Sequence, residues 1–353
     1  MLDEILSQAV ARQASDIFLI AGLPVSYKCS GVICREEAPP LKPSDTTHLA
    51  QLLYERAGRT QETLLATGDD DFSFAVPHLS RFRVNALRQR GSLGLIIRVV
   101  PFTLPDYHQC RIPDSVMSFA QFSRGLVLIT GAAGSGKSTT LACIIDAINS
   151  TRNCHIITLE DPIEFLHSHK KSVVTQRELS IDTASYDVAF RAALREAPDI
   201  ILMGEMRDPE AIRAAVTAAE SGHLVISTLH TIGAANTIDR IIDVFPPTQQ
   251  HQIRAQLALV LEGVASQQLV TAVDGSLVPA FEVMTATPAI RTMIRESKAH
   301  QLDTVIASSS SAGMSTMDQS LLSLVRTGVV SKPIALSHAV NPDWLEKRMA
   351  AQL

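Results

Sequence analysis

The sequence predicts an α/β fold of two domains, the larger of which is built on a parallel sheet. From about residue 113 onward, short apolar runs rich in β-branched residues alternate with stretches of helical spacing, as is typical of such a sheet. The segment Gly131–Ser138 fits G-x-x-x-x-G-K-[ST] between an apolar run and a helical pattern. The 353 residues of the chain are enough for two hydrophobic cores.

Residues 1–100 are expected to form the smaller α/β domain. An amphipathic helical pattern opens the chain, and Asp16–Ile20 predicts a strand that Gly22 and Pro24 bring to an end. The other predicted elements of this domain are an extended segment over Tyr27–Cys34, a helix over Pro43–Tyr54, and paired strands over Arg81–Ala86 and Leu95–Val100.

Residues 101–112 are expected to be a linker, because Pro101, Pro105 and Pro113 disfavour both a helix and a central strand. Residues 113–353 then form the larger domain, with helices at its C-terminal end. Its predicted elements are strands over Leu126–Thr130, His155–Leu159, Ile200–Met203 and Leu224–Thr228, and a helix from the N-cap Asp208 through Pro209 to Gly222.

The loop Gly131–Ser138 carries the chemistry of a phosphate-binding site. Glycines let the backbone curl so that successive N–H groups point at phosphate oxygens, and the start of the following helix favours an anion. The expected nucleotide contacts are Gly131, Ala132, Ala133, Gly134, Ser135, Gly136, Lys137, Ser138 and Thr139. Lys137 can reach the outer phosphates, and the Ser138 hydroxyl can bind Mg²⁺. A glycine-rich turn with a solvated lysine would not explain the flanking strand and helix, so we expect a nucleoside triphosphate site.

Potentially catalytic residues follow the other three predicted strands. Ligands collect beyond the carboxyl ends of strands in an open parallel sheet, so these residues are expected near the phosphate loop. Glu164, in a loop stiffened by Pro162, could activate the attacking water, and Glu205 could organise Mg²⁺ and water. His230 could sense the outer phosphate or hydrogen-bond to Glu205. Each has an ordinary alternative: Glu164 could be a turn carboxylate, Glu205 a charge at the sheet edge, and His230 a capping histidine.

Three further histidines have weaker signals. His223 follows a glycine and is evenly balanced between a site role and a structural one. His167 and His169 flank a serine in a polar loop, and we expect both side chains to be solvated.

Arginines would complete a phosphoryl-transfer site, because charge developing on the transferred group needs a fixed cation. Arg191 and Arg195 lie four residues apart on one predicted helix, and Arg207 closely follows the strand that precedes Glu205. Each could equally be an ordinary surface arginine. The first domain has a second basic group, formed by Arg81, Arg83, Arg88 and Arg98.

The composition is that of an ordinary folded protein, with 46% hydrophobic and 19% charged residues. A net charge of −5 argues against a nucleic-acid binder that works by bulk electrostatics. The five cysteines are scattered without a C-x-x-C pair, as expected of reduced thiols in a cytosol. No stretch approaches the roughly 18 apolar residues of a membrane span, so any action at a membrane is expected from its cytosolic side.

Several motifs together resemble the type II/IV secretion ATPase family, and within it the branch of type IV pilus retraction (twitching motility) ATPases. The similarity spans nearly the whole chain. The resembling segments are Ser15–Phe18 with Ala21–Pro24, Phe82–Asn85, the Asp box Leu159–Phe165, the Walker B region Gly204–Asp208, the His box Gly222–Leu224 with Thr228–Thr231, and Ala289–Glu296, which fits A-I-R-x-x-I-R-E.

The resemblance implies a RecA-like P-loop NTPase core with a smaller N-terminal PAS-like α/β domain. It implies a homohexameric motor that hydrolyses ATP with Mg²⁺, held by Ser138 and Glu205, while Glu164 polarises water. The catalytic set is then Glu164, Glu205, Lys137, His230, Arg195 and Arg207. The expected partners are an inner-membrane pilus platform protein and a second pilus ATPase, with no nucleic acid. The expected location is cytoplasmic and peripheral at the inner membrane.

Three alternatives stay open at this point. An assembly or secretion ATPase of the same family would share the catalytic residues, although the retraction branch is shorter and lacks a four-cysteine zinc site. A nucleic-acid translocase on the same type of core is a different class, for which 5% aromatic residues offer little base stacking. A regulatory ring subunit would bind ATP without hydrolysing it. The helix expected over Ala289–Glu296 has an apolar stripe and a basic stripe that could bind a partner or simply pack.

Overall fold

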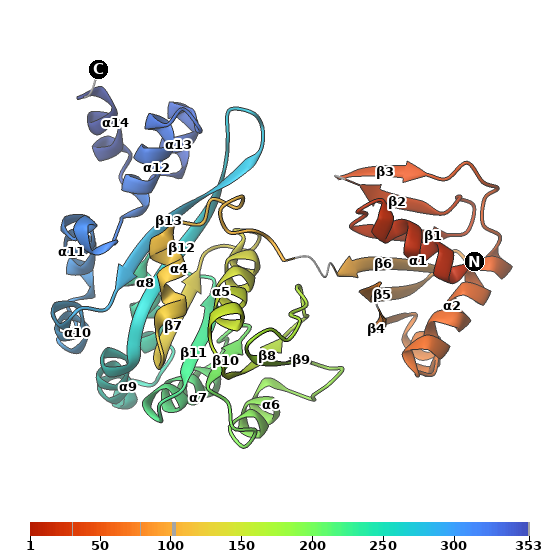
Figure 1. Ribbon diagram of the computed structural model, residues 1–353, viewed down its shortest axis with the longest axis horizontal. Helices are drawn as coiled ribbons and strands as arrows, with labels where there is room; N and C mark the ends of the chain where they lie inside the picture. The colour runs from red at the N-terminus through yellow and green to blue at the C-terminus, as the bar shows by residue number, and fades with distance from the viewer. Residues whose placement is uncertain (30, 78, 101–103, 352–353) are drawn as a thin grey trace. The chain divides into compact units, whose positions relative to one another are not determined.

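The computed structural model describes residues 1–29, 31–77, 79–100 and 104–351. The chain divides near residue 103 into two compact units, each with its own sheet (Figure 1), and the segment Glu164–Leu166 groups with the first. Each unit has its own hydrophobic core. Of the expected linker over residues 101–112, residues 101–103 lie outside the described part of the chain.

The first unit is a six-stranded antiparallel sheet in the order β3-β2-β1-β6-β5-β4. The strands are β1 (Asp16–Ile20), β2 (Ser26–Cys29), β3 (Val32–Arg35), β4 (Asp69–Val76), β5 (Ser80–Gln89) and β6 (Ser92–Val100). The helices are α1 (Leu2–Ala11), α2 (Pro43–Ala57) and α3 (Glu62–Thr67). The strand over Asp16–Ile20, the helix that begins at Pro43 and the β5–β6 pair were predicted, whereas β4 was not.

Local sequence explains the boundaries of α2. Pro43 occupies the first helical turn, where its missing N–H has no intrahelical partner to lose, and the Asp45 carboxylate accepts a hydrogen bond from Lys42 N at 2.7 Å. The helix stops at Gly58, which has a left-handed φ of 64°. Its buried Leu49 and Leu53 pack into the core of this unit.

The second unit is a seven-stranded sheet in the order β13-β12-β7-β11-β10-β8-β9. The strands are β7 (Gly125–Thr130), β8 (His155–Glu160), β9 (Val173–Glu178), β10 (Ile200–Met203), β11 (Leu224–Leu229), β12 (Leu261–Thr271) and β13 (Leu277–Thr285). All neighbours are parallel except β12 and β13, which form an antiparallel pair. The four predicted strands are β7, β8, β10 and β11, and the carboxyl ends of these parallel strands lie at one edge.

Helices cover both faces of this sheet, and β7 contributes to both layers. Its Leu126 and Leu128 pack with one set of helices, while Val127 and Ile129 pack on the opposite face with α5. The helices of this unit are α4 (Asp114–Met117), α5 (Lys137–Thr151), α6 (Tyr186–Ala193), α7 (Pro209–Glu220), α8 (Ala234–Asp243), α9 (Pro247–Val260), α10 (Pro288–Arg295), α11 (Leu302–Ser308), α12 (Met317–Arg326), α13 (Lys332–His338) and α14 (Pro342–Ala350).

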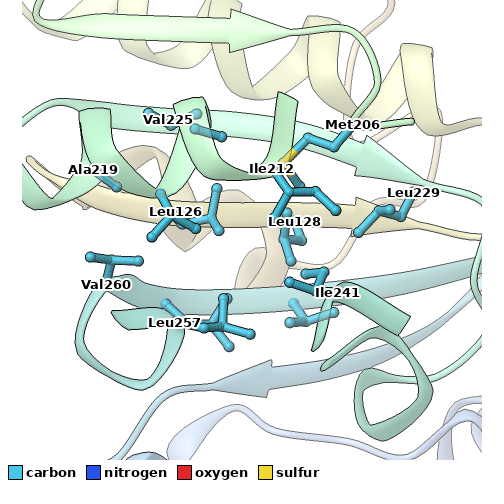
Figure 2. Close-up of a cluster of buried hydrophobic side chains, with 14 of the residues drawn as sticks. Leu126, Leu128, Met206, Ile212, Ala219, Val225, Leu229, Ile241, Leu257 and Val260 are labelled. Carbon is cyan, nitrogen blue, oxygen red and sulfur yellow. The ribbon is translucent and has the colours of Figure 1, made fainter. Parts of the chain in front are cut away.

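Figure 2 shows the larger core, in which α7, α8 and α9 pack against β7 and β11. Its labelled side chains are Leu126, Leu128, Met206, Ile212, Ala219, Val225, Leu229, Ile241, Leu257 and Val260. A separate cluster joins α12, α13 and α14 to the distal parts of β12 and β13. Within the residues that the structure describes, no helix is both long and apolar enough to cross a lipid bilayer.

The helix α10 forms as expected, with the Thr287 hydroxyl as its N-cap. Its Ile290 and Ile294 are buried. Arg291 donates hydrogen bonds to the carbonyls at the end of α9, including Leu259 O at 2.7 Å, and pairs with Glu262 at 3.0 Å. Of the two alternatives for this helix, the contacts of Arg291 match packing, because its guanidinium caps a neighbouring helix.

Candidate nucleotide-binding site

The phosphate loop runs from the end of β7 at Thr130 to the start of α5 at Lys137, as the sequence predicted. Gly131 and Gly136 have φ values of 140° and 89°, a region that side chains rarely adopt. Gly136 is the N-cap of α5, so the free N–H groups of the first helical turn are at the loop. Backbone N–H groups and a helix N-terminus make this loop fit a phosphate.

Two polar side chains of the loop are buried in ways that suit an anion. Lys137 is 8% exposed, and its Nζ donates to the carbonyl oxygens of Gly131 and Ala132, both at 2.8 Å. The Ser135 hydroxyl is buried and has no hydrogen-bond partner among the described residues. A buried hydroxyl without a partner is costly, and a phosphate oxygen would satisfy it.

A chain of polar side-chain contacts links the loop to the ends of β10 and β11. Lys137 Nζ lies 3.5 Å from His230 Nδ1, and His230 Nε2 lies 3.3 Å from Glu205 Oε1. The other oxygen of Glu205 accepts a hydrogen bond from Arg207 Nε at 2.8 Å, and this contact raises the pKa of the Arg207 guanidinium. Of the two contacts proposed for His230, the structure shows the one with Glu205. The Glu205 carboxylate therefore contacts both Arg207 and His230, and His230 links it to Lys137 of the phosphate loop.

The backbone around Glu205 is held by the two neighbouring strands. Gly204 N donates to Leu159 O of β8 at 2.8 Å, and Thr228 Oγ1 of β11 donates to Gly204 O at 2.5 Å. Met206 N donates to Thr228 O at 3.2 Å. The turn that carries Glu205 and Arg207 is thus tied to β8 and β11, which fixes both side chains near His230.

Two further residues lie at the carboxyl edge of this sheet, and the sequence analysis did not identify them. Tyr186, at the start of α6, is largely buried, and this burial together with the Asp161 carboxylate raises the pKa of its hydroxyl. Arg240 of α8 lines a cavity of about 300 Å³ together with Glu205, Arg207 and His230. Neither residue belongs to a motif. A helix that follows a strand-end loop, as α8 does, is the signal that could have pointed to Arg240.

The structure does not bring Arg195 or His223 to this group. Arg195 lies beyond the end of α6 rather than on it, next to Glu196, whose carbonyl oxygen is 2.9 Å from His155 Nδ1 at the start of β8. His223 precedes β11, and its Nδ1 lies 3.1 Å from Ala218 O near the end of α7. Both therefore lie at the amino edge of the sheet, opposite the phosphate loop. Arg195 therefore does not contact the site of its own chain, and its catalytic role stays a prediction.

Arg191 remains on α6 but is paired with Asp187 at 2.7 Å on the exposed surface. Glu164 is exposed and belongs to the segment that groups with the first unit, so its action on water stays a prediction.

The expectation that His167 is solvated is wrong. Its ring is largely buried, Nδ1 has no hydrogen-bond partner among the described residues, and burial lowers the pKa to about 4. His169 is exposed as expected, although its Nδ1 accepts a hydrogen bond from Val174 N. The difference arises because the loop folds back along β9, where His167 N donates to Gln176 Oε1.

The first-unit arginines divide between the two faces of their sheet. Arg81 and Arg83 alternate on β5 with buried Phe82 and Val84, and Arg83 is directly opposite Arg98 on β6. Arg98 Nε lies 3.1 Å from Asp16 Oδ1, which offsets the repulsion between the two guanidiniums. Arg88 has the parity of the core residues instead, so the predicted basic group consists of the other three.

The residues near the loop also fit a divalent cation. Mg²⁺ prefers oxygen donors, and the half-buried Ser138 hydroxyl at the start of α5 and the Glu205 carboxylate supply them. Ser138 is next to Lys137 in the chain, and Glu205 is linked to Lys137 through His230.

Comparisons with known proteins agree with this architecture. The family model described as type II/IV secretion system protein matches residues 1–325. The chain belongs to this family. It is 44% identical over 343 residues to the type IV pilus retractation ATPase PilT of Pseudomonas aeruginosa, a match that covers 97% of this chain and 99% of that protein. It is 48% identical over 274 residues to a twitching motility protein of Neisseria gonorrhoeae, covering 77% and 73% of the two chains.

A solved structure has the same fold. The crystal structure of the pilus retraction motor PilT with bound ADP superimposes with a TM-score of 0.89 at 42% identity, and the match covers 98% of this chain and 99% of that one. The predicted α/β class, with a RecA-like P-loop core and a smaller N-terminal PAS-like domain, is therefore confirmed.

Proposed function

We propose that this chain is a motor ATPase that hydrolyses ATP to drive type IV pilus retraction. The observation that carries the proposal is the continuous chain of Lys137, His230, Glu205 and Arg207 beside a phosphate loop. Two relatives named for pilus retraction and twitching motility support the biological role. We further propose a homohexamer that acts at the cytoplasmic face of the inner membrane on a pilus platform protein, with a second pilus ATPase as a further partner.

The residues divide the work of hydrolysis between holding the phosphates and stabilising the charge that develops on them. The loop N–H groups and Lys137 hold the outer phosphates, for which Lys137 exchanges its present carbonyl contacts for phosphate oxygens. Arg207 and His230 both contact Glu205, so the Arg207 guanidinium supplies positive charge at the strand ends and the His230 ring is held beside it. Glu164 orients the attacking water.

Ser138 and Glu205 are the residues that would hold Mg²⁺, together with the nucleotide. The ion neutralises charge on the phosphate oxygens when it is bound. Glu205 is held between His230 and Arg207, so these neighbours set the position of its carboxylate for that purpose.

The proposal is tested with the purified full-length chain and Glu164→Gln. The wild type is expected to release phosphate from ATP, and the variant to lose turnover while it still binds ADP, because the change removes a proton acceptor without touching the loop. Glu196→Gln, at the amino edge, is the matched control and should keep its turnover. A wild-type protein that binds ADP but shows no hydrolysis would favour the regulatory subunit instead.

The direction of the motor is tested in cells. A strain that carries Glu164→Gln is expected to have more surface pili than the wild type and no twitching, because fibres are assembled but not withdrawn. A bald cell would assign this chain to assembly.

A further inference from the structure

Two consecutive polar residues are buried on β12, beside the phosphate loop but outside its motif. Ser266 is fully buried and Gln267 is 3% exposed. Successive side chains of a strand point to opposite faces, so these two residues reach different neighbours. A buried polar side chain in a central strand is costly unless its hydrogen bonds are satisfied, and both residues make such bonds.

Gln267 lies against both ends of the phosphate loop. Its Oε1 accepts a hydrogen bond at 2.8 Å from the hydroxyl of Thr140, a buried residue in the first turn of α5. A Cβ added at Gly136 would lie 2.8 Å from Gln267 Nε2, and a Cβ added at Gly131 would lie 2.2 Å from the Gln267 carbonyl oxygen. The loop therefore has room for no side chain where it meets Gln267.

Ser266 holds the other part of the site. Its Oγ accepts a hydrogen bond at 2.9 Å from Gly233 N, just before α8 begins. Its cross-strand partner on β13 is Glu282, whose Oε1 accepts from Ala234 N at 2.7 Å. The start of α8, which closely follows His230 in the chain, is thus fixed to the same strand as the phosphate loop.

We infer that Gln267 is a positioning residue for the phosphate loop. It acts through the Thr140 hydroxyl and through its contacts with Gly131 and Gly136, and it sets where α5 begins relative to β7. With Ser266 beside it, β12 fixes the loop that holds phosphates and the loop that carries His230 against one strand. The inference rests on the proposed nucleotide binding of that loop. A displacement of even about 1 Å is enough to weaken contacts of this kind.

Gln267→Met tests the inference, with Gln268→Met as a matched control. Gln268 is the next residue on the same strand, and its Oε1 lies 3.2 Å from His338 Nδ1 of α13 rather than near the loop. In the full-length chain, titration with a fluorescent ADP analogue is expected to give a Kd about tenfold higher for Gln267→Met, as for the loss of one buried hydrogen bond. Gln268→Met is expected to stay within about twofold of the wild type.

A second pair of variants keeps the test decisive if Gln267→Met fails to fold. Thr140→Val removes the hydroxyl donor and is expected to weaken ADP binding about tenfold, whereas Thr140→Ser retains the donor and should bind almost as the wild type does. The double variant of Gln267→Met and Thr140→Val should bind little more weakly than either single variant, since both remove the same hydrogen bond.

A merely structural role would lower the unfolding midpoint of Gln267→Met and leave the ADP Kd unchanged, and that result would overturn the inference. Equal binding by Thr140→Val and Thr140→Ser would do the same. ADP binding does not require hydrolysis. A wild-type chain that binds ADP without turnover would therefore count against the proposed motor and leave the role of Gln267 to be decided by the titrations.

Discussion

The two edges of the seven-stranded sheet contain the same residue types in different arrangements. At the carboxyl edge, His230 and Arg207 both contact Glu205, and the group reaches Lys137 in the phosphate loop. At the amino edge, His155 N donates to the Asp199 carboxylate at 2.8 Å, and its ring contacts Glu196 O. These contacts close a turn between strands. What distinguishes the carboxyl edge is the start of α5 in the phosphate loop, whose free N–H groups can bind a phosphate beside these side chains.

The largest difference between the edges is expected for lysine. Lys137→Ala should lower ATP turnover by roughly a thousandfold, because the loop loses its only side-chain cation at the phosphates. Lys170 is the control, because it lies outside the phosphate loop. Its Nζ is 2.6 Å from Asp146 Oδ1. Phosphate release measured for Lys137→Ala and Lys170→Ala makes the comparison. Turnover of Lys137→Ala within about tenfold of the wild type would contradict the assigned site.

The histidines give the next effect. His230→Ala is expected to lower kcat by about a hundredfold, because it breaks the link between Lys137 and Glu205. His223→Ala should change kcat by less than about twofold, since that ring only contacts the end of α7. Steady-state ATPase assays of the two variants give the two kcat values. Equal losses of kcat would show that the two edges of the sheet do not differ in function.

The arginine variants are expected to give a smaller loss of kcat. Arg207→Ala is expected to lower kcat about tenfold, because Arg207 is exposed to solvent and shares Glu205 with His230. Arg195→Ala should change kcat little, because Arg195 lies at the opposite edge of its own chain's sheet. If kcat measurements instead showed a large loss for Arg195→Ala, this arginine would have to act on the site of a neighbouring copy.

His167 is predicted to affect stability and not turnover at neutral pH. Its pKa is about 4 in the folded chain and near 6.5 when unfolded, so the unfolded state takes up a proton first as pH falls. The contribution of neutral His167 to the free energy of unfolding is therefore complete above about pH 6.5. It falls on acidification, and about 2 kcal/mol of it is lost at pH 5. Urea unfolding at pH 7 and pH 5 should show a smaller loss for His167→Gln. The exposed His251→Gln should behave as the wild type does.

Sequence reasoning identified the part of the site that depends on local pattern. Lys137, Glu205 and His230 were found because a glycine-rich loop and apolar runs mark the strand ends. The amino-edge position of His223 could also have been read, since it precedes its strand rather than following it. The strands β9, β12 and β13 were missed; β12 has Ser266, Gln267 and Gln268 in succession, which hides its period.

The sequence by itself determined the phosphate loop, the alternation of strands and helices, and the residues at the strand ends. Each of these depends on residues that are close together in the sequence, because glycine φ values, helix capping and the period of apolar residues act over a few residues. Only the tertiary structure decided that Gln267 contacts a loop more than a hundred residues earlier in the chain, that Arg195 lies at the opposite edge, and that the His167 ring is largely buried. Such contacts depend on strand order and register, which bring distant segments together through packing and leave no local pattern to read.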